Sequence, residues 1–172
     1  MRQRKRKPTD LQLVAHHEAA HAVVALALGR RVERVSIVPS RLSAGRCIIS
    51  GLGVSAMSGR RAFPQAVERL GQNALIYLAG ALAENELDPT ADVEESGASD
   101  LWMAMVSAVP IVGRCRDRRR AYVRRMGREA RTLVRSRWRA IRTLAIALER
   151  RRVLRRAEII RILRNRRVNR RR

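Results

Sequence analysis

An amphipathic pattern near the C-terminal end constrains the fold of this 172-residue chain more than any other feature. From Arg118 to about Arg150, apolar residues recur mostly every three or four positions, which places them on one face of a long helix and leaves arginines on the other. Such a helix must bury its apolar face against other elements. Apolar residues make up 46% of the chain and aromatic residues only 3%, so we expect an aliphatic, mostly helical core. The apolar positions are Val123, Met126, Ala130, Leu133, Ile141, Leu144 and Leu148.

The formal net charge of +23 is concentrated in the same part of the chain. Residues 114–172 carry 25 arginines against four acidic residues, whereas residues 8–113 carry more acidic than basic side chains. A basic segment of that density attracts nucleic acid, an anionic membrane surface or an acidic protein. Its aromatic residues Tyr122 and Trp138 are too sparse for a platform that stacks bases, so nucleic-acid binding as the main role is the weaker interpretation.

Local signals divide the rest of the chain into helices and strands. Thr9 and Gln12 form a capping-box pattern that predicts a helix start, and Gly29 is a residue type that commonly follows a helix end. β-Branched residues then predict a hairpin, and Pro110 is expected to stop a later helix. The expected elements are a helix over 9–28, strands over 31–39 and 46–50, and helices over 64–87, 100–109, 118–150 and 157–163.

These elements predict an α+β, mostly helical fold, in which the first helix is followed by a β-hairpin and a helical bundle with a basic C-terminal arm. We expect residues 1–8 to be a disordered basic leader, 9–113 the core, 114–165 the helical arm of the same domain and 166–172 a frayed tail. Residues 51–61 are expected to form an irregular loop. No apolar run reaches the length of a bilayer span, and the first helix is unlike an export signal, so the expected location is cytoplasmic.

All three histidines of the chain lie in the stretch HHEAAH, residues 16–21. His17 and His21 are one helical turn apart, so their imidazoles share a face and can converge on one metal ion. Glu18 borders this face, where a carboxylate can accept a proton from water that the metal activates. His16 points about 100° away from His17 around the helix and is not expected to bind the same ion. The pattern is typical of zinc hydrolases.

A zinc hydrolase of this kind needs a third protein ligand and leaves the fourth position for water. No histidine follows His21 in the sequence, so the third ligand is expected to be a carboxylate. Spacing alone leaves several candidates open, namely Glu84, Glu86, Glu94, Glu95 and Asp100.

Four stretches, in the same order along the chain, resemble the peptidase domain of the FtsH-type, membrane-anchored, ATP-dependent zinc proteases. They are HHEAAHAVVALAL, VERVSIVPSRLSAGRCI, LIYLAGALAENEL and SGASDLWMA. The later stretch LERRRVLRRAEIIRIL resembles the end of that domain, so the resemblance covers residues 9–163. It implies that His17, His21 and Asp100 are the zinc ligands and that Glu18 is the general base.

The resemblance also places Glu84 at a glutamate of the family's GRxAEE signature. Glu84 would then either orient a ligand histidine or pair with an arginine. Asp100 begins a predicted helix, for which Ser96 or Ser99 is the expected N-cap. Two details differ from the family pattern: the SGASDL stretch is one residue shorter, and Ala20 stands where a glycine is usual.

These observations predict a zinc metallopeptidase, an endopeptidase with one Zn²⁺ per chain that acts on unfolded or partner polypeptides. No G-x-x-x-x-G-K-[ST] motif occurs, so the expected enzyme is stand-alone and ATP-independent or borrows an ATPase partner in trans, and it could form a homo-oligomer. The alternative is a zinc-containing regulatory module that does not cleave and whose arginine-rich arm contacts an anionic partner. Glu18 favours the enzyme, because a structural zinc site needs no base.

Overall fold

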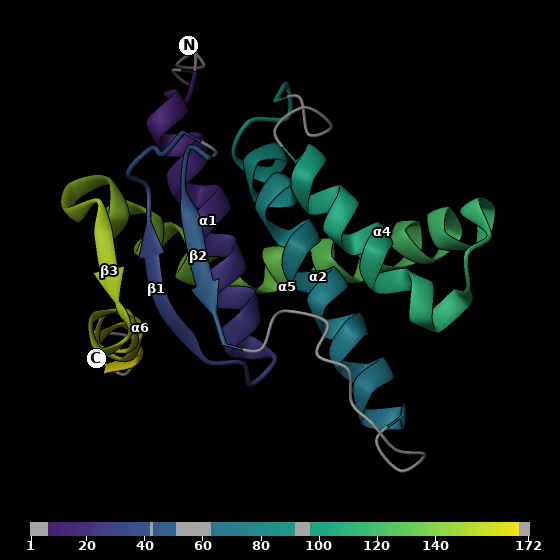
Figure 1. Ribbon diagram of the computed structural model, residues 1–172. Helices are drawn as coiled ribbons and strands as arrows, with labels where there is room; N and C mark the ends of the chain where they lie inside the picture. Colours follow the sequence, from purple (N-terminus) through teal and green to yellow (C-terminus); the bar gives the residue numbers. More distant parts are fainter. Residues whose placement is uncertain (1–6, 42, 51–62, 92–96, 169–172) are drawn as a thin grey trace.

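The computed structural model describes residues 7–41, 43–50, 63–91 and 97–168. The described part is mostly helical, with one small antiparallel sheet in the order β2-β1-β3, as Figure 1 shows. This confirms the predicted α+β class and the hairpin after the first helix. The elements are α1 (Asp10–Ala27), β1 (Val32–Ser36), β2 (Arg46–Ile49), α2 (Phe63–Leu87), α4 (Ala98–Val112), α5 (Arg116–Arg151), β3 (Val153–Arg155) and α6 (Arg156–Val168).

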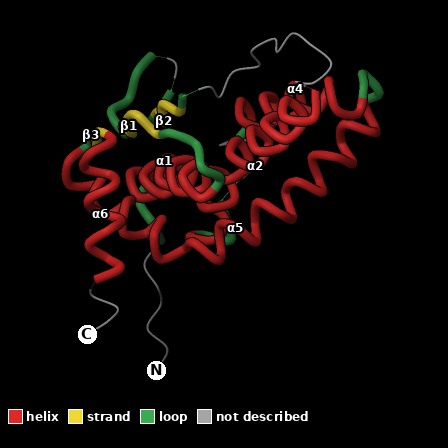
Figure 2. Tube along the Cα trace, turned by 90° about the horizontal axis from the view of Figure 1, so that it is seen from below, coloured by secondary structure: helices red, strands yellow, loops and turns green. Residues whose placement is uncertain are grey.

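Helix α1 lies at the centre of the molecule. It packs against α2, α5, β1 and β2, and Figure 2 shows the sheet on one side of α1 and α5 on the other. Small side chains on α1 allow this close approach from several directions, since Ala15, Ala19, Ala20 and Ala22 are all fully buried. Ala20, where the resembled family has a glycine, is therefore part of the core.

The ends of α1 are fixed as the sequence predicts. The backbone N–H of Thr9 donates to Gln12 Oε1 over 3.0 Å, and the backbone N–H of Gln12 donates to Thr9 Oγ1 over 3.3 Å, which completes the capping box. At the other end Gly29 has a φ of +74°, a conformation that favours glycine. Both predictions are confirmed, and together they set the limits of the helix that carries the histidines.

The amphipathic pattern of α5 is also confirmed. Its apolar face packs against α1, α2 and α4, and most of its arginines are exposed. Of the predicted apolar positions, Leu133 is partly buried and the others are buried, namely Val123, Met126, Ala130, Ile141, Leu144 and Leu148. None of the described helices combines the length and apolar character needed to cross a membrane.

Two predictions for α4 are wrong. Pro110 does not stop this helix, which continues through it to Val112. A proline lacks an N–H and its ring crowds the carbonyl four residues earlier, but Pro110 lies within the last turn, where the helix has only two more residues to add. The helix therefore ends at Gly113, with a φ of +79°. Ser99 is not the N-cap, because the helix begins earlier and Gly97 occupies that position without a side-chain hydrogen bond. Ser96 lies outside the described residues.

Strand β3 was not predicted. It pairs antiparallel with β1, where Ser36 lies opposite Val153 and Arg34 opposite Arg155. Arg152 separates it from α5 and has a φ of +65°, a conformation that non-glycine residues adopt rarely. After β3, α6 extends to Val168, beyond the predicted end at 163. The predictions for residues 1–6, for the loop over 51–61 and for residues 169–172 lie outside the described residues.

Candidate metal centre

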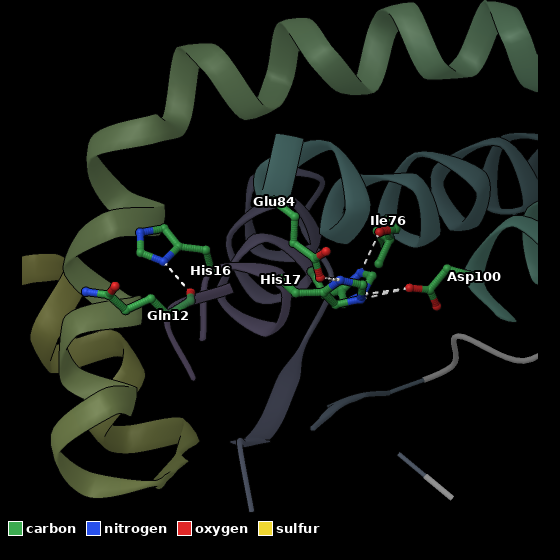
Figure 3. A network of polar contacts seen from close by, with 7 residues as sticks. Gln12, His16, His17, Ile76, Glu84 and Asp100 are labelled. Carbon is green, nitrogen blue, oxygen red and sulfur yellow. Dashed lines mark hydrogen bonds and ion pairs between the residues drawn. The ribbon is translucent and has the colours of Figure 1, made fainter. Parts of the chain in front are cut away.

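Three predicted ligands meet between α1 and the first turn of α4. His17 Nε2 lies 3.0 Å and His21 Nε2 lies 3.1 Å from the same oxygen, Oδ2 of Asp100. Figure 3 shows the Asp100 carboxylate pointing at the His17 imidazole. One ligand atom from each residue lies within 4.8 Å of the other two, so this group could hold a metal ion.

Each imidazole ring makes a hydrogen bond through Nδ1, on the side away from Asp100, and this bond determines that Nε2 faces Asp100. His21 Nδ1 lies 2.7 Å from the backbone oxygen of Ile76, which can only accept, so Nδ1 donates and carries the proton. In the same way His17 Nδ1 donates to Glu84 Oε1 over 2.6 Å. A neutral imidazole protonated at Nδ1 has its lone pair at Nε2. When both rings are neutral, two lone pairs and a carboxylate oxygen therefore converge, and either a proton or a metal ion between them would satisfy these acceptors.

The electrostatics of the group also favour a positive charge at this point. Burial lowers the pKa of His17, but hydrogen bonds with Asp100 and Glu84 outweigh burial and raise that pKa to about 10. Burial raises the pKa of Asp100, but its hydrogen bonds with His17 and His21 more than offset this and leave the pKa below its usual value. Both shifts show that the Asp100 carboxylate is stabilised as an anion next to a positive charge. A divalent metal ion at the same point would supply that positive charge.

The group opens onto a cleft of about 490 Å³. Side chains and backbone from α1, α2, β2 with its preceding loop, and the start of α4 line this cleft. Two imidazole nitrogens and one carboxylate oxygen are a donor set found in catalytic zinc sites, in which the open side of the ion is left for water or substrate. The residues present therefore fit a metal centre with access from solvent.

The predicted base, Glu18, lines the same cleft and is 7% exposed. Burial raises the pKa of its carboxyl group, and the neighbouring His21 and His17 oppose that rise. The loop before β2 comes into contact with this side chain at Gly45, where an added Cβ would lie 2.7 Å from both Cγ and Oε1 of Glu18. The backbone of Gly45 therefore forms one wall of the space that holds the carboxylate.

A second glycine lies beside the Nε2 atoms of the two imidazoles. Gly80 lies within α2, and a Cβ there would be 2.4 Å from His17 Nε2 and 2.6 Å from His21 Nε2. Only a glycine leaves this space to the two rings. Sequence reasoning gave neither Gly45 nor Gly80 a role at the metal centre. The available signal was Gly80 inside a helix, where glycine costs about 1 kcal/mol relative to alanine and so needs a packing reason.

The remaining predicted residues lie around the group or away from it. His16 Nδ1 donates to the backbone oxygen of Gln12 over 2.7 Å, and its ring packs against Trp138, so His16 is not part of the group. Of the carboxylate candidates, Glu84 contacts His17 rather than the shared point, and Glu86 pairs with Arg135. The other two candidates, Glu94 and Glu95, lie outside the described residues.

In comparisons with known proteins, the chain matches no protein-family model and no curated protein. A functional assignment therefore depends on the geometry and chemistry of His17, His21, Asp100 and their surroundings.

Proposed function

We propose that this protein is a zinc-dependent endopeptidase that hydrolyses peptide bonds of unfolded or partner polypeptides. The observation that carries the proposal is the convergence of His17, His21 and Asp100 on one point, beside the buried carboxylate of Glu18 in an open cleft. The sequence resemblance to the peptidase domain of FtsH-type zinc proteases supports the same assignment.

His17, His21 and Asp100 would hold the zinc ion. Zinc bound by two imidazoles and a carboxylate lowers the pKa of water and polarises a scissile carbonyl group. The surrounding hydrogen bonds prepare the ligands for this role, because Glu84 fixes the orientation of the His17 ring and the Ile76 carbonyl fixes that of His21. Both rings are thereby held in the tautomer that leaves Nε2 available.

We assign the role of general base to Glu18, which is supported by its place in the lining of the cleft and by its raised pKa. Its carboxylate would accept a proton from the attacking water and deliver it to the nitrogen of the leaving amine. Since burial raises the pKa of Glu18, this carboxylate is a stronger base than an exposed glutamate. Contact with the Gly45 backbone limits the movement of the side chain.

The free edge of strand β2, beside the cleft, is an argument for a polypeptide as the substrate. β2 pairs with β1 on one side, and no described strand pairs with its other side. Arg46 and Cys47 of this strand line the cleft. An extended chain can add to such an edge through main-chain hydrogen bonds, which any sequence can form. This arrangement favours an unfolded polypeptide over a small molecule as the substrate.

The test compares cleavage and zinc content in the same samples. Wild-type protein loaded with zinc is expected to cleave unfolded casein without ATP. Glu18→Gln is expected to keep its zinc and lose at least about 100-fold in cleavage rate, the usual scale of a lost general base. Glu68→Gln, an exposed change on α2, is the matched control and should cleave like the wild type. If zinc-loaded wild type cleaves neither casein nor a broad peptide library, the enzyme proposal is wrong and the non-cleaving regulatory role replaces it.

A further inference from the structure

The solvent-facing side of α5 carries a line of arginines that the proposed peptidase site does not use. Because they recur every three or four residues, they lie along one face of the helix. The ends of the line, Arg120 and Arg142, are about 33 Å apart along the axis at 1.5 Å per residue. All are exposed except Arg131, which is partly buried. We name this set the arginine array: Arg120, Arg124, Arg128, Arg131, Arg135, Arg139 and Arg142.

Two arginines of the array connect α5 to α2, and the charges of the others are not paired within the described part of the protein. Arg131 donates to Asn85 over 3.1 Å and Arg135 donates to Glu86 over 2.9 Å, and these two contacts fasten α5 to the end of α2. In the described part of the chain, the guanidinium groups of the other five arginines make no hydrogen bond or ion pair with the protein. Figure 2 shows α5 along the outer side of the molecule, away from the sheet. Five cations along this face of α5 are therefore open to solvent, on both sides of the two arginines that contact α2.

The chemistry of the array fits phosphate groups. A guanidinium group is planar and donates two parallel hydrogen bonds to a phosphate, and it is always charged. Within α5, Glu129 is the acidic residue between Arg120 and Arg142, and it lies about 100° around the helix from Arg128, outside the array. No acidic side chain of this segment therefore interrupts the row.

We propose that the arginine array binds the phosphate backbone of a double-stranded nucleic acid. A duplex presents closely spaced charges along a stiff rod, and one turn of B-DNA is about 34 Å long, close to the length of the array. The binding is independent of base sequence, because the aromatic residues of α5 face the protein. Tyr122 is buried with Arg125 over its ring, and Trp138 packs against His16.

A membrane surface matches the array less well. Helices that lie in a membrane interface carry several large apolar side chains beside their basic residues. Among the described residues of α5, Ile146 is the one exposed large apolar side chain. The other exposed large apolar residues of the described part lie on other elements, on α4 or in and near the hairpin: Val38, Ile48, Leu101, Trp102 and Met103.

The array and the cleft are separate surfaces. No α5 residue is among the described residues that line the cleft, and α1 lies between α5 and the sheet in Figure 2. A bound duplex would leave the cleft accessible. Nucleic-acid binding therefore does not depend on the proposed peptidase activity and can be tested without it.

The experiment measures fluorescence anisotropy of a labelled 24-base-pair DNA duplex of mixed sequence, titrated with the full chain at several salt concentrations. The array variant combines Arg124→Gln, Arg128→Gln and Arg139→Gln. The control variant removes the same charge from other exposed sites, at Arg41, Arg161 and Arg164. Each lost phosphate contact reduces the slope of log K against log salt by about 0.9, so the array variant should lose about 2.7 from that slope. The control variant should keep the wild-type slope.

Thermal unfolding confirms that both variants are folded before their binding is compared. Equal losses in the two variants would overturn the proposal, because net charge alone would then explain binding. An unchanged duplex affinity in the array variant would overturn it too. Two further probes would then identify the partner that the array binds instead of a duplex. The partner is a membrane if the array variant loses binding to phosphatidylserine vesicles but not to DNA. It is an acidic protein if polyglutamate displaces the duplex as well as unlabelled DNA does at equal charge.

Discussion

The carboxylate of Glu84 accepts a hydrogen bond from His17 Nδ1 over 2.6 Å, on the side of the imidazole ring opposite Asp100 (Figure 3). Glu84 lies on α2 and His17 on α1, so the contact couples the packing of two helices to the orientation of one ligand. A carboxylate in this place also increases the electron density at Nε2 and so strengthens the bond to a metal.

We therefore predict that Glu84→Gln weakens zinc binding by about 10- to 100-fold, because the negative charge behind His17 is lost. Competition with a chromophoric chelator measures the affinity. Glu86→Gln is the matched control, since Glu86 is two residues further along α2 and pairs with the exposed Arg135 instead. Equal zinc affinity in the wild type and both variants would show that Glu84 has no part in positioning the ligand.

Gly80→Ala should abolish zinc binding in a folded protein. The new methyl group would lie 2.4 Å from His17 Nε2 and 2.6 Å from His21 Nε2, so the two rings must move apart or rotate. Zinc content after dialysis against a weak chelator, together with circular dichroism, checks this expectation. A Gly80→Ala protein with full zinc content would contradict the close approach of α2 to the imidazoles.

Gly127→Ala provides the comparison for a glycine inside a helix. Nothing lies within 4 Å of a Cβ at this position of α5. The change should therefore leave zinc binding intact and stabilise the protein by about 0.5–1 kcal/mol, through the higher helix propensity of alanine. Urea unfolding measures the difference. A loss of stability would indicate a contact that the structure does not contain.

Gly45→Ala should separate catalysis from metal binding. Its methyl group would displace Glu18, which it approaches to 2.7 Å, but would leave the ligand atoms of His17 and His21 in place. We expect normal zinc content with a lower kcat and a smaller effect on KM. If zinc and activity disappear together, Gly45 supports the whole cleft rather than the position of the base.

Thr9→Ala tests the support of α1, the helix that carries both histidines. The change removes the side-chain half of the capping box and should destabilise the protein by about 1 kcal/mol in urea unfolding. Thr9→Ser keeps the hydroxyl group and should retain most of the stability. Equal losses for alanine and serine would mean that the methyl group of Thr9, not its hydroxyl, provides the stabilisation.

Local patterns were sufficient to predict much of the fold. The capping box at Thr9, the turn at Gly29 and the spacing of His17 and His21 all depend on residues within one or two helical turns of each other. The apolar face of α5 follows from the same short-range periodicity. These features can be read from a single sequence because the chain itself brings the residues together.

Features that depend on distant contacts could not be predicted in this way. Asp100 lies 83 residues after His17, and spacing alone did not distinguish it from the other carboxylates. Gly80 matters only because α2 approaches the imidazoles. Strand β3 has three residues within an arginine-rich stretch, and it follows Arg152, whose positive φ the residue type does not suggest. Its pairing with β1 supplies the hydrogen bonds that make it a strand.

The most direct test of the central claim is the zinc content of purified, zinc-loaded protein, measured by mass spectrometry of the metal. We predict one zinc ion per wild-type chain and almost none in folded His17→Ala or Asp100→Ala protein, because the loss of either ligand leaves two donors. A wild-type chain without zinc, or an Asp100→Ala protein that retains as much zinc as the wild type, would contradict the account.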